Sequence, residues 1–287
     1  MRYRIQHSTR YQYQQPVTLR AHTLRLKPRS DGSQQLLSFA LAIDPAPVNQ
    51  SAVVDVDGNP NLALWFASQP TDQLTLTTTA EVETTRRNPF DYLAEPWATT
   101  LPIDYPSTVA ASLYPYLHPP LYPVASPPVV ELAQGIVHQV EGNVGLFLTT
   151  LTQRIYETCQ YTTRPTGHPW PPGITWAKKL GTCRDFTLLL MEACRVVGLA
   201  ARFVSGYEEG DSSVPHRDLH AWAEVYIPGG GWRGFDPTHG LAVADRHVAL
   251  VASAFPAQAA PLSGSTEEGG RVGSTLDTLV QVDVLGE

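Results

Sequence analysis

A proline-rich segment divides this chain into two parts. Residues 96–128 contain nine prolines in 33 positions, interleaved with tyrosines. Proline lacks a backbone N–H and fixes φ, so this density opposes helix interiors and sheet ladders. We therefore predict a connector over residues 88–128 that is laid over the surface with short turns, and a folded region on each side of it.

The first 87 residues alternate apolar and polar side chains with the period of β-strands. Tyr3, Ile5 and His7 alternate in this way, and Asp-Gly turns at 31–32 and 57–58 separate the apolar segments. Short strands with such turns predict a small antiparallel β-sandwich over residues 1–87. Arginines and tyrosines in this region would suit a ligand site, but exposed strand faces use the same residues, and we favour that reading.

Composition and charge exclude several classes of protein. With 20 Lys+Arg against 27 Asp+Glu, the net charge of −7 argues against nucleic acid as a partner. A hydrophobic content of 43% with 16% charged residues is ordinary for a globular protein. No run approaches the roughly 18 apolar residues of a membrane span, and no apolar stretch follows the first charges. We therefore expect a cytoplasmic protein with no membrane partner; its oligomeric state is not predicted.

The three cysteines, at 159, 183 and 194, are too few for a disulfide framework, so each is expected to be a thiol. Apolar spacing predicts helices over residues 129–140 and 146–159, followed by a second proline-rich loop at 163–173. A third helix begins after Thr182 and ends at Gly198. Its apolar face consists of Phe186, Leu189, Leu190, Ala193, Cys194 and Val197.

Cys183 lies at the start of this third helix and off its apolar face. Unpaired N–H groups and the helix dipole favour a thiolate at that position. The other interpretation is a small buried hydrophobic residue, which is the commoner role of an intracellular cysteine. Cys159 and Cys194 fall on apolar faces and are explained by packing.

Downstream of the helix, strands are predicted over residues 201–207, 219–227 and 232–238. The last two are joined by Pro228-Gly229-Gly230-Gly231, which predicts a hairpin. Folding this hairpin runs His220 and Asp236 toward the same end of the sheet. A cysteine at a helix start, a histidine and an aspartate are the three parts of an activated nucleophile.

Four ordered blocks carry a resemblance to a known family: Gly181-Thr182-Cys183-Arg184-Asp185-Phe186, residues 202–207, residues 220–225, and residues 231–238. Together they resemble the bacterial transglutaminase-like family of the papain-like cysteine-enzyme superfamily. The first 90 residues are similar to the β-rich domain that precedes the core in one bacterial branch. The resemblance implies an α+β fold whose core, residues 129–287, packs a helix carrying the cysteine on an antiparallel sheet carrying the histidine and aspartate.

Carried over onto this sequence, the resemblance makes Cys183 the nucleophile, His220 the general base and Asp236 the acid that orients the histidine. It implies acyl transfer at an amide bond through a thioester, as in a peptidase, an amidase or a transglutaminase. The expected substrate is a peptide or a small amide, and no metal or organic cofactor is required. Some members of this branch are thought to act beside ATP-grasp ligases, so such a ligase is a candidate partner.

Several neighbours of these three residues have open roles. The backbone N–H of Cys183 is the natural first oxyanion donor, and Trp170, Trp176 and Gln153 remain alternatives for the second. Asp185, in the first helical turn, is expected to support the site, through the helix dipole or an arginine. Trp222 and Glu224 share a strand face with His220; either could line the cleft, while core packing and an ion pair are equally good explanations.

Two positions depart from the family pattern. Residues 252–255, Ala-Ser-Ala-Phe, stand where this branch commonly has Gly-Arg-Asp-Tyr, so substrate recognition is expected to differ. His239 stands where the family often has asparagine, which changes the surroundings of the three residues without removing any of them.

Two rival functions fit parts of the sequence. His216 and His220 have an HxxxH spacing that makes a zinc site on a helix, but Pro215 and the flanking strand pattern argue against a metal hydrolase. The second rival is a non-catalytic module that binds peptide or protein partners on the same fold.

Overall fold

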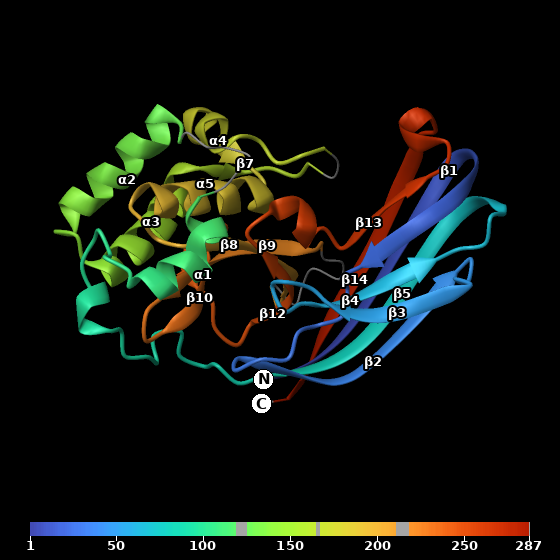
Figure 1. Cartoon of the computed structure of the whole chain (residues 1–287), viewed down its shortest axis with the longest axis horizontal. Coiled ribbons are helices and arrows are strands. Elements are labelled where there is room, and N and C mark those ends of the chain that lie inside the picture. Colours follow the sequence, from blue (N-terminus) through green and yellow to red (C-terminus); the bar gives the residue numbers. More distant parts are fainter. Residues whose placement is uncertain (119–124, 165–166, 211–217, 287) are drawn as a thin grey trace.

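A computed structural model describes residues 1–118, 125–164, 167–210 and 218–286. Figure 1 shows a core of helices and strands beside a curled sheet of long strands, with the two chain ends close together. The predicted α+β fold class is confirmed.

The N-terminal sheet is built around one very long strand. It contains β1 (Arg2–Leu24), β2 (Gln34–Asp44), β3 (Asn49–Val54), β4 (Pro60–Trp65) and β5 (Pro70–Thr84), in the order β2-β5-β1-β4-β3. All pairings are antiparallel, and β1 runs through both halves of the sheet. Tyr3, Ile5 and His7 are buried while their neighbours are exposed, because successive side chains of a strand face opposite sides.

The C-terminal residues join this same sheet, although the sequence pattern assigned them to the core. Strands β13 (Leu262–Thr266) and β14 (Ser274–Gly286) both pair antiparallel with β1. Residues 257–270, whose small and polar side chains are typical of a loop, therefore contain a strand, with short 3-10 helices η2 (Pro256–Ala259) and η3 (Gly269–Arg271) on either side. The small and polar residues of β13 show no alternation of apolar side chains. Its pairing partner, β1, lies at the other end of the chain, so the local sequence did not predict the strand.

The proline-rich connector is more ordered than the predicted short turns. It contains a 3-10 helix, η1 (Pro96–Ala98), and an 11-residue helix, α1 (Ser107–Leu117), whose last turn includes Pro115. Arg195 donates to the backbone carbonyl of Tyr116 at 2.8 Å, and the Tyr116 hydroxyl donates to Asp57. The connector thus contacts both the core and the N-terminal sheet.

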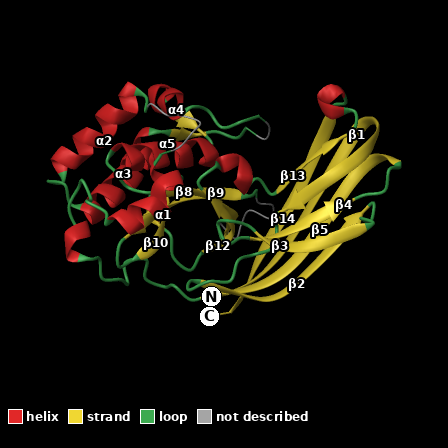
Figure 2. Cartoon of the chain, viewed as in Figure 1, coloured by secondary structure: helices red, strands yellow, loops and turns green. Residues whose placement is uncertain are grey.

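The core packs helices on one side of an antiparallel sheet (Figure 2). Its helices are α2 (Pro127–Gln139), α3 (Val144–Thr158), α4 (Pro172–Lys178) and α5 (Cys183–Val196). The five-stranded sheet has the order β11-β10-β9-β8-β12, formed by β8 (Ala201–Glu208), β9 (His220–Ile227), β10 (Gly231–Asp236), β11 (Leu241–Ala242) and β12 (His247–Ser253). Short strands β6 (Gln160–Tyr161) and β7 (Leu180–Gly181) pair in parallel. In the described residues, no helix is long and apolar enough to cross a membrane.

Two side-chain amides of the N-terminal region bind the outer edge of β12. Gln34 pairs with the backbone N–H and carbonyl of Ala249 at 2.7 and 2.9 Å. Asn59 pairs in the same way with Ala252 at 2.9 and 2.8 Å. Since β12 has β8 as a neighbour on its other side, these amides satisfy its remaining edge and hold the two regions together.

Candidate active site

Cys183 is the first residue of α5, which packs against β8 and β9. The start of the helix is held by the fully buried Asp185. Its carboxylate accepts the backbone N–H groups of Thr182 at 2.8 Å and Trp170 at 2.6 Å, and pairs with Arg164 at 2.7 Å. Because a buried charge needs all of its partners, the first turn of α5 is fixed, and Cys183 with it.

His220 and Asp236 meet across the predicted hairpin. The ladder between β9 and β10 pairs Phe235 with Ala223, so the next residue, Asp236, lies opposite Trp222. Residues two apart on a strand share a face, which makes Asp236 a diagonal neighbour of His220. Nε2 of His220 lies 2.7 Å from Oδ2 of Asp236. The hairpin thus brings the predicted histidine and aspartate into contact.

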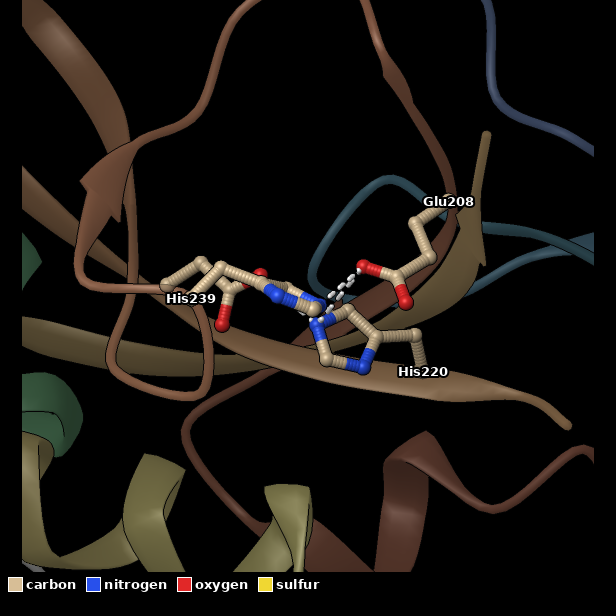
Figure 3. Close-up of side chains that lie close together, drawn as sticks. Glu208, His220 and His239 are labelled. Atoms are coloured by element: carbon tan, nitrogen blue, oxygen red, sulfur yellow. Dashed lines mark hydrogen bonds and ion pairs between the residues drawn. The ribbon is translucent and has the colours of Figure 1, made fainter. Parts of the chain in front are cut away.

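The His220 ring lies between a thiol and a carboxylate. Burial lowers the pKa of His220, but the charge and hydrogen bond of Asp236 and then those of Cys183 hold it well above its ordinary value. Burial raises the pKa of Asp236, but His220 and His247 outweigh it and hold that pKa far below its ordinary value. Since Nε2 faces Asp236, Nδ1 is the nitrogen left for Cys183, and Figure 3 shows it pointing away from Glu208.

Asp236 has a second histidine partner that the sequence analysis missed. Nε2 of His247, the first residue of β12, lies 3.0 Å from the same Oδ2. The other oxygen, Oδ1, accepts the backbone N–H of Thr238 at 2.9 Å. His247 is 7% exposed and Asp236 fully buried. The sequence offered one sign of this role, a histidine at the start of a largely apolar strand. Its contact with Asp236 depends on the pairing of β12 with β8.

Trp222 and Glu224 now have distinct roles. Trp222 is 1% exposed and stacks on the His220 ring, with centroids 6.2 Å apart. Gly206 of β8 provides the room, because a Cβ there would collide with the Trp222 ring. Glu224 pairs with Arg202 at 2.6 Å and does not line the cavity beside His220. The packing explanation therefore holds for Trp222 and the ion-pair explanation for Glu224.

Further ionisable side chains face Nε2 of His220 (Figure 3). Oε2 of Glu208, at the end of β8, lies 3.5 Å from that nitrogen and 2.7 Å from Nε2 of His239. Burial raises the pKa of Glu208, but the hydrogen bond from His239 and the charge of His220 bring it below its ordinary value. All three residues, with Tyr161 and Thr238, line a cavity of about 360 Å³. This cavity gives solvent a route to the catalytic candidate His220.

Two family models match the chain. Residues 3–83 match the bacterial transglutaminase-like N-terminal region, and residues 130–237, which include Cys183, His220 and Asp236, match the transglutaminase-like superfamily. The chain carries a transglutaminase-like core behind a bacterial transglutaminase-like N-terminal region. The resemblance drawn from the four sequence blocks is thereby confirmed.

Relatives of this transglutaminase-like chain include proteins of known sequence and of known structure. An uncharacterized protein of Mycobacterium tuberculosis is 29% identical over 290 residues, covering 92% of this chain and 87% of that protein. A Pseudomonas aeruginosa protein named protein-glutamine gamma-glutamyltransferase is 28% identical over 116 residues, covering 37% of this chain and 17% of that protein. A Cytophaga hutchinsonii structure described as a candidate cysteine protease has a TM-score of 0.76 and 24% identity, covering 100% of this chain and 91% of that one. That similarity supports the fold.

The structure of the transglutaminase-like core does not assign the second oxyanion donor or test the HxxxH pair. Gln153 lines a separate cavity with Gly240, and the backbone N–H of Trp170 donates to the carboxylate of Asp185. The second oxyanion donor therefore stays open. His216 lies outside the described residues, so the HxxxH pair is not tested.

The segment that departs from the family pattern, residues 252–255, is largely interior. Ala252, Ser253 and Ala254 are 0%, 1% and 4% exposed. It contains no charged residue that could bind a substrate.

Proposed function

We infer that this chain is a cysteine-dependent enzyme that hydrolyses or transfers acyl groups at amide bonds. Cys183 is the nucleophile, His220 the acid and base, and Asp236 the residue that orients the imidazole. The observation that carries this proposal is the position of His220, whose Nε2 lies 2.7 Å from a fully buried carboxylate while Cys183 is its other partner. Thiolate, imidazole and carboxylate in this order form an activated nucleophile.

The first half-reaction forms a thioester. The thiolate of Cys183 attacks the carbonyl carbon, a C–S bond forms, and the carbonyl π electrons move to oxygen. The backbone N–H of Cys183, at the helix start, is placed to stabilise that oxyanion. As the oxyanion collapses, the C–N bond breaks and Nδ1 of His220 gives its proton to the departing amine.

The second half-reaction releases the acyl group. Water or a second amine gives a proton to His220 as it attacks the thioester, and the C–S bond breaks to return the thiolate of Cys183. Water yields a carboxylic acid and an amine yields a new amide. Two of the similar proteins, a candidate cysteine protease and a protein-glutamine gamma-glutamyltransferase, are named for these two outcomes. The substrate class is a peptide or small amide.

The test is a search for the thioester and its products. We would incubate the protein with a pool of synthetic peptides rich in glutamine and asparagine, with and without hydroxylamine, and follow both protein and peptides by mass spectrometry. The variant Cys183→Ser replaces the thiol with a hydroxyl, a far weaker nucleophile in this site, and Cys159→Ser is the matched control because Cys159 is a buried thiol elsewhere in the core.

We expect an acyl adduct on the peptide containing Cys183, hydrolysed products without hydroxylamine, and hydroxamates with it. Cys159→Ser should behave as wild type and Cys183→Ser should form neither product. Turnover that survives in Cys183→Ser would overturn the proposal. Folded wild-type protein that binds peptides without forming an adduct or product would instead support the non-catalytic module.

A further inference from the structure

Four donor atoms converge beside Nε2 of His220, and we name them the four-donor cluster. They are Oε2 of Glu208, Nε2 of His220, Oδ2 of Asp236 and Nε2 of His239, all within 4.8 Å of one another. They come from the ends of β8 and β10, the start of β9, and the segment just after β10. Figure 3 shows Glu208, His220 and His239 directed toward a common point. Two imidazoles and two carboxylates suit a borderline divalent cation and would balance its charge.

The separations of these atoms, at most 4.8 Å, fit a tetrahedral zinc ion after side-chain movements of about 1 Å. Zinc bonds to nitrogen and oxygen are about 2.0–2.1 Å long, so the ligand atoms of a tetrahedral ion lie about 3.4 Å apart. Glu208 and His220 already have that spacing, at 3.5 Å. His220 with Asp236, and His239 with Glu208, are each separated by 2.7 Å. Both pairs are hydrogen bonds. When an ion replaces the shared proton, the distance between the two ligand atoms increases by about 0.7 Å.

An ion can reach the cluster from solvent. The side chains of His239 and Glu208 are 42% and 22% exposed and line the cavity of about 360 Å³. Thr238 lines the same cavity, and its Oγ1 is buried with no hydrogen-bond partner among the described residues. That hydroxyl is available to a water molecule on the ion. His247 bonds to the same Oδ2 of Asp236, so Asp236 keeps a hydrogen-bond partner that does not depend on His220.

We propose that the four-donor cluster binds a zinc-class divalent cation and that this ion inhibits the enzyme. The ion takes Nε2 of His220 and leaves Cys183 outside its coordination sphere, since Cys183 faces the other ring nitrogen. It is an inhibitor and not a catalytic cofactor.

Inhibition follows from what the ion replaces. In the free enzyme the Nε2 proton of His220 is held by Asp236, and the ring passes its Nδ1 proton to the leaving group. With Nε2 bound to the cation, the ring cannot become an imidazolium, so it can no longer take a proton from water or an amine at Nδ1. This consequence rests on the proposed function, whereas the binding site itself does not.

Zinc binding is measured directly, so that its failure is separate from a failure of the proposed enzyme activity. Isothermal titration of tag-free protein with zinc would compare wild type with Glu208→Gln and His239→Asn. His138→Asn is the matched control, because His138 is an exposed histidine on α2. We expect one saturable site in wild type and the control, and a dissociation constant at least about tenfold larger in each ligand variant.

Cobalt substitution separates this site from a thiolate site. The Co²⁺ complex of wild type should show visible bands of a tetrahedral ion, no sulfur-to-cobalt charge-transfer band in the near ultraviolet, and the same spectrum in Cys183→Ala. Calcium should not compete, since it prefers oxygen ligands to imidazole.

Four results would overturn the proposal. They are the absence of saturable zinc binding to wild type, a zinc affinity of Glu208→Gln and His239→Asn equal to that of wild type, a charge-transfer band that Cys183→Ala removes, and competition by calcium as strong as that of zinc.

Discussion

The core sheet and the N-terminal sheet place their charged side chains in opposite ways. In the core, His220, Asp236 and His247 are all at most 7% exposed, and both histidines bond to Asp236. On the N-terminal sheet, Arg2 and Arg4 pair with Glu81 on the outer face, with side chains 51%, 46% and 20% exposed. Buried charges lose much when one partner is removed, whereas water replaces a lost surface partner. Removing one partner should therefore impair the candidate site of the core sheet and have little effect on the outer face of the N-terminal sheet.

The largest effect is expected at Asp236. The change Asp236→Asn removes the negative charge that faces both His220 and His247, and it favours the wrong tautomer of the catalytic ring. Turnover in the peptide assay should fall by about 10³- to 10⁴-fold. The matched control Asp277→Asn, on the exposed face of β14, should keep wild-type turnover. A fall of less than tenfold in folded Asp236→Asn would contradict this role.

The junction of the two sheets should be the next most sensitive place. Asn59→Ala removes both hydrogen bonds to Ala252 and leaves its buried N–H and carbonyl without partners. We expect the free energy of unfolding to fall by about 3 kcal/mol, measured by urea denaturation. Asn49→Ala, at an exposed position of β3, is the control and should unfold as wild type does. Equal stability of both variants would show that the amides do not hold β12.

His7 makes the same junction sensitive to pH. Its ring bonds to the Tyr207 hydroxyl at 2.8 Å and to Thr9 at 2.7 Å, and burial lowers the pKa of His7 to about 4. In the unfolded chain a histidine takes up its proton near pH 6.5, so between about pH 6.5 and 4 the unfolded state binds more protons. Stability should therefore fall as pH decreases through this window, by up to about 3 kcal/mol from this residue.

The variant His7→Gln keeps hydrogen-bonding groups and removes the titration. Urea denaturation at several pH values should show a smaller loss of stability between about pH 6.5 and 4 for His7→Gln than for wild type. Identical pH profiles would mean that burial does not lower the pKa of His7 in the folded protein.

The smallest effect is expected on the outer face of the N-terminal sheet. Glu81→Gln breaks the pairs with Arg2 and Arg4, which remain solvated. Its melting temperature, followed by circular dichroism, should match that of wild type. A clear decrease would mean that the surface charges act as the buried ones do, which would remove the contrast between the sheets.

Local patterns in the sequence predicted the elements that carry the candidate site. The apolar spacing from Phe186 to Val197 located α5 with Cys183 at its start, and the Pro-Gly turn located the hairpin of His220 and Asp236. What depends on distant pairing was missed. Strands β13 and β14 pair with β1, which lies at the other end of the chain. The contact of His247 with Asp236 likewise depends on the pairing of β12 with β8. The connector helix was missed because proline density outweighed its buried Leu113.

The most direct test of the account is the rate at which each cysteine reacts with iodoacetamide as a function of pH. Peptide mass spectrometry would compare wild type, His220→Ala and the control His138→Ala. Burial raises the pKa of the Cys159 and Cys194 thiols, so both should react slowly. Cys183 should react faster than these two at pH values below about 8.5, the pKa of a free thiol, and lose this advantage only in His220→Ala. A Cys183 as inert as the other two, or one that is insensitive to His220, would contradict the account.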